Sequence, residues 1–275
     1  MSEADESYWL LSETSSIWET RDPRVDRGLP FWAGLRWLAA GWRDLWIRPV
    51  ASLTYGLLVF ALSAAFVFAL VETGHDYILF PALAGFMIVA PFLALGCYEK
   101  SRAIEQGSPV NFRAMLFVRP RAGAQVFFLG LMLFLVLVLW MRAAVLIYAL
   151  FFGVTAFPGL DHIVPMLLGT RDGWLMLIVG SAVGALFAAF AFAAGVFSVP
   201  MMLDRRVDAL TAMGTSVKLV WNNLPVMLTW GFLVCLVFAL CVATGFLGMV
   251  LLFPWLGHAT WHAYRGIADP AEATP

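Results

Sequence analysis

Long apolar runs alternate with short polar segments along the whole of this 275-residue chain. Each run contains about 20 residues or more, the length that an α-helix needs to cross about 30 Å of hydrocarbon. The last run is long enough for two crossings, which would join near Thr244 and Gly245. The pattern therefore predicts an all-α fold with six transmembrane helices. These helices are expected over residues 50–71, 77–97, 122–152, 174–199, 225–243 and 245–264.

An amphipathic segment precedes every second apolar run. In residues 31–48 the apolar positions recur at the spacing of one helical face, while Arg36 and Arg43 lie away from it. These apolar positions are Phe31, Leu35, Leu38, Trp42 and Leu45. Trp and Arg together are typical of a helix in the headgroup region. Similar segments end at Pro120 and Pro225. We therefore predict three units, each an interfacial helix on the cytoplasmic face followed by a hairpin of two spans.

Composition and charge give the class of protein and its orientation. With 62% hydrophobic and 13% charged residues, the chain lies outside the range of soluble globular proteins. Fifteen of its 17 lysines and arginines lie before the first span, after the sixth, or in the second and fourth loops. The positive-inside rule places these segments and both termini in the cytoplasm. We expect a multi-pass protein of the bacterial inner (plasma) membrane, with the lipid bilayer as partner. The basic residues form no separate domain, so no nucleic-acid partner is expected.

The chain divides into one membrane domain and two tails. Residues 1–30 are polar and acidic, and we predict a disordered cytoplasmic tail. Residues 31–267 form the membrane domain, and residues 268–275 form a short C-terminal tail. Within the fourth apolar run, Gly180 and Gly184 belong to a ridge of small residues, which predicts close helix packing there.

Arg142 lies within the third apolar run. A charge at the bilayer centre costs about 2.5–3.5 kcal/mol, so such a residue normally has a partner or a function. If the span begins near Ala122, Arg142 reaches the outer interface beside Trp140 and extends its side chain to the headgroups. If the span begins near Leu131, Arg142 lies in mid-membrane and needs a carboxylate, backbone carbonyls or a water cavity. Arg142 is therefore a candidate for binding a ligand or partner.

His258 and His262 lie four residues apart in the sixth predicted span, so they share one helical face. Two ligands do not complete a metal site, and no cysteine or carboxylate lies nearby in the sequence. Haem would need one axial histidine and a roomy apolar slot. We therefore expect no metal and no cofactor, and we treat both histidines as candidate ligand- or partner-binding residues. The alternative interpretation is a polar cluster that hydrogen-bonds to neighbouring helix ends.

Catalytic patterns are missing from the sequence. All 18 Asp and Glu residues lie in the tail, in loops or near span ends, whereas proton-coupled transporters usually need an acid within the membrane. Ser181 and His258 are the candidates for intramembrane proteolysis, but their depths differ by roughly 9 Å, beyond hydrogen-bond reach. No phosphate loop, dinucleotide fingerprint or His-Glu-x-x-His motif is present. The sequence predicts a protein without catalytic residues, not an enzyme.

Several stretches carry a resemblance to a known family. They are residues 91–102 with 105–109, 140–142 with 148–153, 199–205, and 257–265. Over residues 37–265 the chain resembles a proteobacterial family of uncharacterised six-span integral membrane proteins, some of whose members carry a cytochrome c oxidase label. The resemblance implies the six-span fold. A haem–copper centre needs more membrane histidines than the two near the sixth span, so the label implies an accessory or assembly role for this chain.

Three functions follow as hypotheses. The first is a non-catalytic inner-membrane protein that serves as an accessory, assembly or scaffolding partner of a larger membrane complex, such as a respiratory complex. The alternative is a carrier or permeability pathway for a small anion or lipid, with Arg142 as the binding charge. The third is a haem or metal protein that uses His258 and His262.

Overall fold

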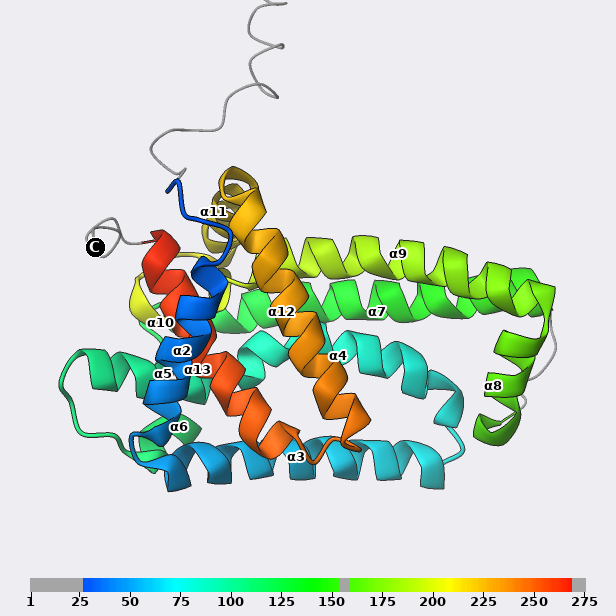
Figure 1. Cartoon of the computed structure of the whole chain (residues 1–275), viewed down its shortest axis with the longest axis horizontal. Helices are drawn as coiled ribbons and strands as arrows, with labels where there is room; N and C mark the ends of the chain where they lie inside the picture. Colours follow the sequence, from blue (N-terminus) through cyan, green and yellow to red (C-terminus); the bar gives the residue numbers. More distant parts are fainter. Residues whose placement is uncertain (1–26, 154–158, 269–275) are drawn as a thin grey trace, which may run out of the picture.

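The computed structural model describes residues 27–153 and 159–268, and the regular structure in these two ranges is helical (Figure 1). Of the two predicted tails, residues 1–26 and 269–275 lie outside the described residues. The first helices are α2 (Ala33–Trp46), α3 (Pro49–Glu72), the short 3₁₀ helix η1 (Asp76–Ile78), α4 (Leu79–Leu93), α5 (Leu95–Glu105) and α6 (Phe112–Leu116). They are followed by α7 (Gln125–Phe152), α8 (Leu160–Gly169), α9 (Arg171–Gly195), α10 (Ser198–Asp204), α11 (Ala209–Asn222), α12 (Leu224–Ala243) and α13 (Met249–Ala268).

Five helical segments in the described part of the chain are long and apolar enough to cross a membrane. They are Pro49–Glu72, Pro81–Glu105, Gln125–Phe152, Arg171–Asp204 and Leu224–Ala243. The all-α, polytopic membrane fold predicted from the apolar runs is therefore confirmed. Helix α13, which covers most of the sixth predicted span, is not among the five, because His258, His262 and Arg265 make it less apolar. The count of six spans and their pairing as hairpins stay predictions.

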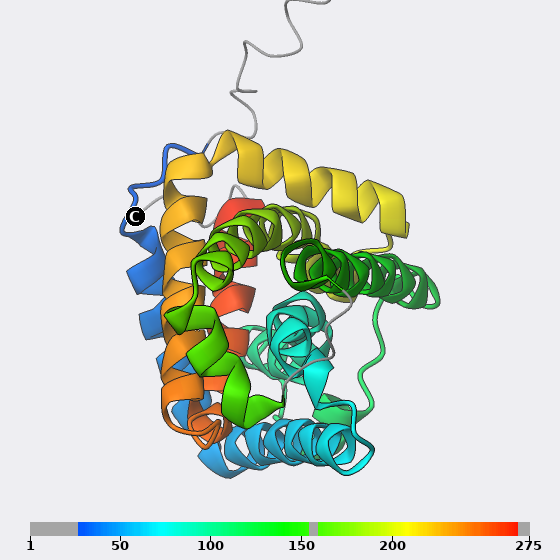
Figure 2. The same ribbon diagram turned by 90° about the vertical axis from the view of Figure 1, so that its right-hand side faces the viewer.

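The helices form two groups with different directions. Helices α3, α4, α7 and α9 run along the longest axis of the molecule, while α2, α12 and α13 cross that axis (Figure 1). The shorter helices α5, α6, α10 and α11 lie at the same end as α2, and α8 lies at the opposite end. Figure 2 looks along α4 and α7, with α11 (yellow) lying across the top of the bundle. The short helices α5, α6, α10 and α11 therefore gather with α2 at one end of the long helices α3, α4, α7 and α9.

Prolines mark where several helices begin or break. Pro49 and Pro225 stand in the first turns of α3 and α12, where the missing backbone N–H has no helical partner and the fixed φ suits a helix. Pro91 lies inside α4, where it removes an intrahelical hydrogen bond. Three residues later, at Ala94, α4 gives way to α5. The single predicted span over residues 77–97 is therefore built from two helices.

Helix α2 has two apolar faces rather than one. Of the five apolar positions predicted from its period, Leu38 and Leu45 are buried, whereas Leu35 and Trp42 remain exposed. A second face, which includes the buried Trp37, packs against α13. The exposed apolar side chains suit contact with lipid, as predicted for an interfacial helix. The face that packs against α13 was not predicted.

Helix α13 packs against α2, α3 and α5, and glycines set how closely it approaches them. A Cβ atom on Gly41 of α2 would lie 2.5 Å from the backbone nitrogen of Ala259. A Cβ atom on Gly257 of α13 would lie 2.6 Å from the Cβ atom of Cys97 in α5. No side chain larger than hydrogen fits at either contact without a shift of the neighbour. These close approaches bring the polar residues of α13 within hydrogen-bond distance of the other helices.

Candidate functional site

A network of polar side chains is buried where α13 meets α2, α3 and α5, and His258 lies at its centre. Its side chain is 0% exposed. The Nε2 atom lies 2.9 Å from the hydroxyl oxygen of Ser52. The Nδ1 atom lies 2.9 Å from the hydroxyl oxygen of Ser101 and 3.1 Å from the carbonyl oxygen of Cys97. Both ring nitrogens of His258 are therefore satisfied by the protein itself.

Lys100 extends the network towards the end of α2. Its ammonium group donates to the hydroxyl oxygen of Ser52 at 2.7 Å and to the carbonyl oxygens of Leu45 at 3.3 Å and Arg48 at 3.5 Å. The last carbonyls of a helix have no intrahelical donor, and the helix dipole favours a positive charge beside them. Lys100 is only 1% exposed, so it acts as a buried cap on the C-terminal end of α2.

Asp44 and His262 form the opposite end of the network. The Nε2 atom of His262 lies 2.8 Å from Oδ2 of Asp44, which also hydrogen-bonds with Ser101. Burial alone would raise the pKa of the Asp44 carboxyl, but the hydrogen bonds with His262 and Ser101 oppose it, and the net pKa lies below its ordinary value. The carboxylate is therefore held in its charged form. His262 is partly exposed, so this end of the network approaches the surface.

The network has the chemistry of an interhelical clamp. Ser52 and Lys100 lie at the distance expected of a serine nucleophile and its lysine base. Ser52 is 0% exposed and Lys100 is 1% exposed, so neither group is open to solvent. Residues 27–153 and 159–268 contain no group of three or more His, Cys, Asp and Glu side chains that could hold a metal ion. What remains is a set of hydrogen bonds that ties four helices together.

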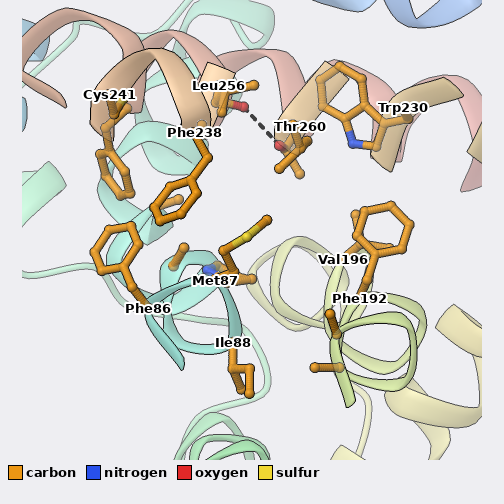
Figure 3. A pocket seen from close by; sticks show the side chains of 18 of the residues that line it. Phe86, Met87, Ile88, Phe192, Val196, Trp230, Phe238, Cys241, Leu256 and Thr260 are labelled. Atoms are coloured by element: carbon orange, nitrogen blue, oxygen red, sulfur yellow. Dashed lines mark hydrogen bonds between the residues drawn. The ribbon is translucent and has the colours of Figure 1, made fainter. Parts of the chain in front are cut away.

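An apolar cavity of about 150 Å³ lies on the other side of α13, between α4, α9 and α12 (Figure 3). Aromatic side chains make up much of its wall, including Phe86 of α4, Phe192 of α9 and Phe238 of α12. The hydroxyl of Thr260, also in the wall, donates to the carbonyl oxygen of Leu256 at 2.8 Å. The cavity is partly enclosed and has no charged residue in its lining.

One polar group in this wall is unsatisfied. Trp230 of α12 is 0% exposed, and in the described part of the chain its indole Nε1 has no hydrogen-bond partner. Figure 3 shows the nitrogen on the side of the ring that faces the interior of the cavity. A buried donor without an acceptor is rare in folded proteins, because its lost hydration is not replaced. The cavity is therefore apolar with a single free donor.

The predicted site residues fall into two places. His258 and His262 belong to one network, as the alternative interpretation of a polar cluster had it, but they contact different partners. Arg142 lies on an exposed part of α7, and it lines neither the cavity nor the network. Its neighbour Trp140 does line the cavity and donates its indole N–H to the carbonyl oxygen of Pro81 at 3.1 Å. The candidate charge for an anion is therefore separate from the cavity.

Most of the network and the free donor of the cavity were missed from the sequence. Asp44 was assigned to an interfacial helix because it lies in the amphipathic segment 31–48, and Lys100 to a cytoplasmic loop because it follows the second apolar run. Ser52 and Trp230 lie inside apolar runs, where the pattern does not distinguish an inward from an outward side chain. Only the polar residues at the end of the last apolar run gave a usable signal.

Comparison with known proteins agrees with the membrane fold. Residues 79–204 match the model of a family described as "Predicted integral membrane protein (DUF2189)". The match begins at the first residue of α4 and ends at the last residue of α10. No curated protein and no solved structure matches the chain.

The similarity to an uncharacterised family of integral membrane proteins, predicted from the sequence motifs, is thereby confirmed. The chain is a multi-pass integral membrane protein. The matched region includes Lys100, Ser101 and the walls of the cavity on α4 and α9, whereas α2, α3, α12 and α13 lie outside it.

Proposed function

We propose that this chain is a non-catalytic protein of the bacterial inner membrane that binds a small apolar molecule dissolved in the bilayer. The end of the molecule that carries α2, α5, α6, α10 and α11 would face the cytoplasm. The observation that carries the proposal is the cavity of about 150 Å³ between α4, α9, α12 and α13. A ligand would enter such a site from the lipid bilayer and not from water.

The position of the cavity supports entry of the ligand from the bilayer. The walls on α4, α9 and α12 come from segments that are long and apolar enough to cross a membrane. Binding sites for small apolar molecules are typically concave, largely apolar and provided with few polar groups. An apolar cavity of about 150 Å³ in another protein stays dry and binds benzene. A cavity of the present size therefore accommodates one ring-sized group.

The polar network supports the absence of catalysis. Its serine–lysine pair is not open to solvent, and each of its groups already has protein partners. Its physical effect is to fix α13, and with it one wall of the cavity, against α2, α3 and α5. The cytoplasmic placement of this end of the molecule is based on the positive-inside rule. Arg43 lies on α2, Arg113 on α6, and Arg205 directly after α10.

Two of the three functions predicted from the sequence remain hypotheses beside this proposal. An accessory or assembly role in a membrane complex is compatible with a bound apolar molecule, and co-purification from native membranes tests it. A carrier that depends on Arg142 stays a prediction. Because Arg142 does not line the cavity, Arg142→Ala is expected to leave ligand binding in the cavity unchanged.

Binding of fluorobenzene to the protein in lipid nanodiscs tests the proposal. Fluorine NMR measures the saturable fraction above partitioning into empty nanodiscs. Ala191→Leu places a larger side chain at a buried position of the wall, whereas Ala189→Leu changes an exposed position of the same helix. We expect saturable binding to the wild type and to Ala189→Leu, and its loss in Ala191→Leu. Equal signals from all three proteins and from empty nanodiscs would overturn the proposal.

A further inference from the structure

We infer that Trp230 determines the specificity of the cavity, and that the ligand is a neutral six-membered ring that carries a carbonyl group. The inference rests on the proposed function and names the chemical class that the cavity selects. It follows from three observations: a buried donor without a partner, a fixed orientation of that donor, and walls that lack charge.

The indole N–H of Trp230 has no acceptor in the described part of the protein, although the side chain is 0% exposed. Thr260 also lines the cavity, and its hydroxyl is already engaged. Its hydroxyl donates to the carbonyl oxygen of Leu256, and it also hydrogen-bonds with Tyr98. The donor of Trp230 is therefore available to a molecule inside the cavity.

Packing holds the indole in this orientation. The ring of Trp37 in α2 meets that of Trp230 edge to face, with 5.5 Å between the ring centroids. A Cβ atom on Gly34 of α2 would lie 3.5 Å from the indole ring, an ordinary van der Waals distance, so α2 packs directly beside the ring. A fully buried ring of this size rotates only if the elements packed around it move. The free N–H is therefore a fixed feature of the site.

The chemistry of the walls then defines the ligand. An indole N–H only donates, so the ligand must present an acceptor. The lining has no charged side chain to neutralise an ion, so that acceptor is neutral. Phe86, Phe192 and Phe238 offer aromatic surfaces, against which a planar ring packs well. A ring ketone, an aryl ketone or a quinone meets all three conditions, whereas a simple hydrocarbon leaves the donor unsatisfied.

Two matched probes separate the inference from the function on which it rests. The probes are para-fluoroacetophenone, which carries a carbonyl, and para-fluoroethylbenzene, which does not. Each is titrated by fluorine NMR into wild type, Trp230→Phe and Trp174→Phe in nanodiscs, and corrected for partitioning into empty nanodiscs. Trp174 is an exposed residue of α9 outside the cavity, so its substitution controls for the loss of one indole.

We expect the carbonyl probe to bind the wild type and Trp174→Phe about 10-fold more tightly than the ethyl probe, because a buried donor gains an acceptor. In Trp230→Phe we expect this preference to fall to about 1, with the affinity for the ethyl probe unchanged within about 2-fold. An equal preference in Trp230→Phe and wild type would overturn the inference and leave the proposed function standing. Saturable binding of neither probe to the wild type would overturn both.

A second measurement needs no variant of Trp230. With nitrogen-labelled tryptophan, the carbonyl probe should move one indole N–H resonance of the wild type downfield, while the ethyl probe should not. An indole N–H spectrum that responds equally to both probes would show that water or nothing occupies the donor, and would overturn the inference.

Discussion

Gly41→Ala tests whether the close contact between α2 and α13 stabilises the polar network between these helices. The added Cβ atom would lie 2.5 Å from the backbone nitrogen, 2.7 Å from the Cα atom and 2.8 Å from the Cβ atom of Ala259. These atoms belong to α13 itself, so no side-chain rotation relieves the overlap. The two helices must move apart, and the hydrogen bond between Asp44 and His262 must lengthen with them.

The size of the effect follows from two opposing contributions. Overpacking costs about 1–3 kcal/mol, while alanine gains about 1 kcal/mol of helix propensity over glycine. Because the overlap involves backbone atoms, we take the upper end of the overpacking cost and expect a net loss of about 2 kcal/mol. For a chain of this size each kcal/mol changes the unfolding midpoint by about 2–4 °C, so Gly41→Ala should lower Tm by about 4–8 °C.

The assay is thermal unfolding in one detergent, followed by tryptophan fluorescence at one scan rate, since membrane proteins often unfold irreversibly. Gly214→Ala is the matched control, because a Cβ atom on Gly214 of α11 would point into open space, with no neighbouring atom within 4 Å. It should raise Tm by about 2 °C through helix propensity alone. A Tm of Gly41→Ala at or above that of the wild type, with Gly214→Ala behaving as expected, would refute the reasoning.

Two further predictions concern the polar network. His258→Leu removes one hydrogen-bond partner from each of the buried hydroxyls of Ser52 and Ser101, so we expect a loss of about 2–4 kcal/mol and a Tm lower by about 4–16 °C. The exposed His75→Leu should change Tm by less than about 2 °C, and equal shifts would contradict the prediction. The folded pKa of Asp44 lies below its ordinary value of 3.8, so its stabilisation is present above that value and is lost as the pH falls through the folded pKa. Asp44→Asn should therefore lower Tm near neutral pH, and the Tm of the variant should approach that of the wild type as the pH falls below about 3.8. A difference in Tm that stays constant across a pH series would exclude this linkage.

The sequence predicted those features of the fold that depend on local composition. Long apolar runs become α3, α7 and α12, because length and apolarity alone decide whether a helix crosses a membrane. The small-residue ridge of the fourth run was predicted to pack closely, and a Cβ atom on Gly184 would lie 2.9 Å from the ring of Trp140. The break at Ala94 was missed, since a proline at the end of an apolar run reads equally well as the end of a span.

The candidate site depends on contacts between distant segments, which no local pattern contains. Ser52 and His258 are separated by 206 positions, and Asp44 and His262 by 218. Spacing placed the two histidines on one helical face, but their partners come from α2, α3 and α5. Trp230 lies in a run that is apolar on every side, so its inward orientation becomes visible only when α4 and α9 are placed opposite. Helix packing, not sequence period, creates both the network and the cavity.

The large separation of α2 and α13 along the chain, 218 positions between Asp44 and His262, has a consequence for biosynthesis. The ribosome releases α2 and α3 long before α13, yet the buried faces of both helices pack against α13. Until α13 arrives, Asp44, Ser52 and Lys100 lack the histidines and the covering helix that bury them. The N-terminal part of the membrane domain therefore reaches its final packing only after α13 has been synthesised. A chain that stops short of α13 leaves these polar groups uncovered and without their histidine partners.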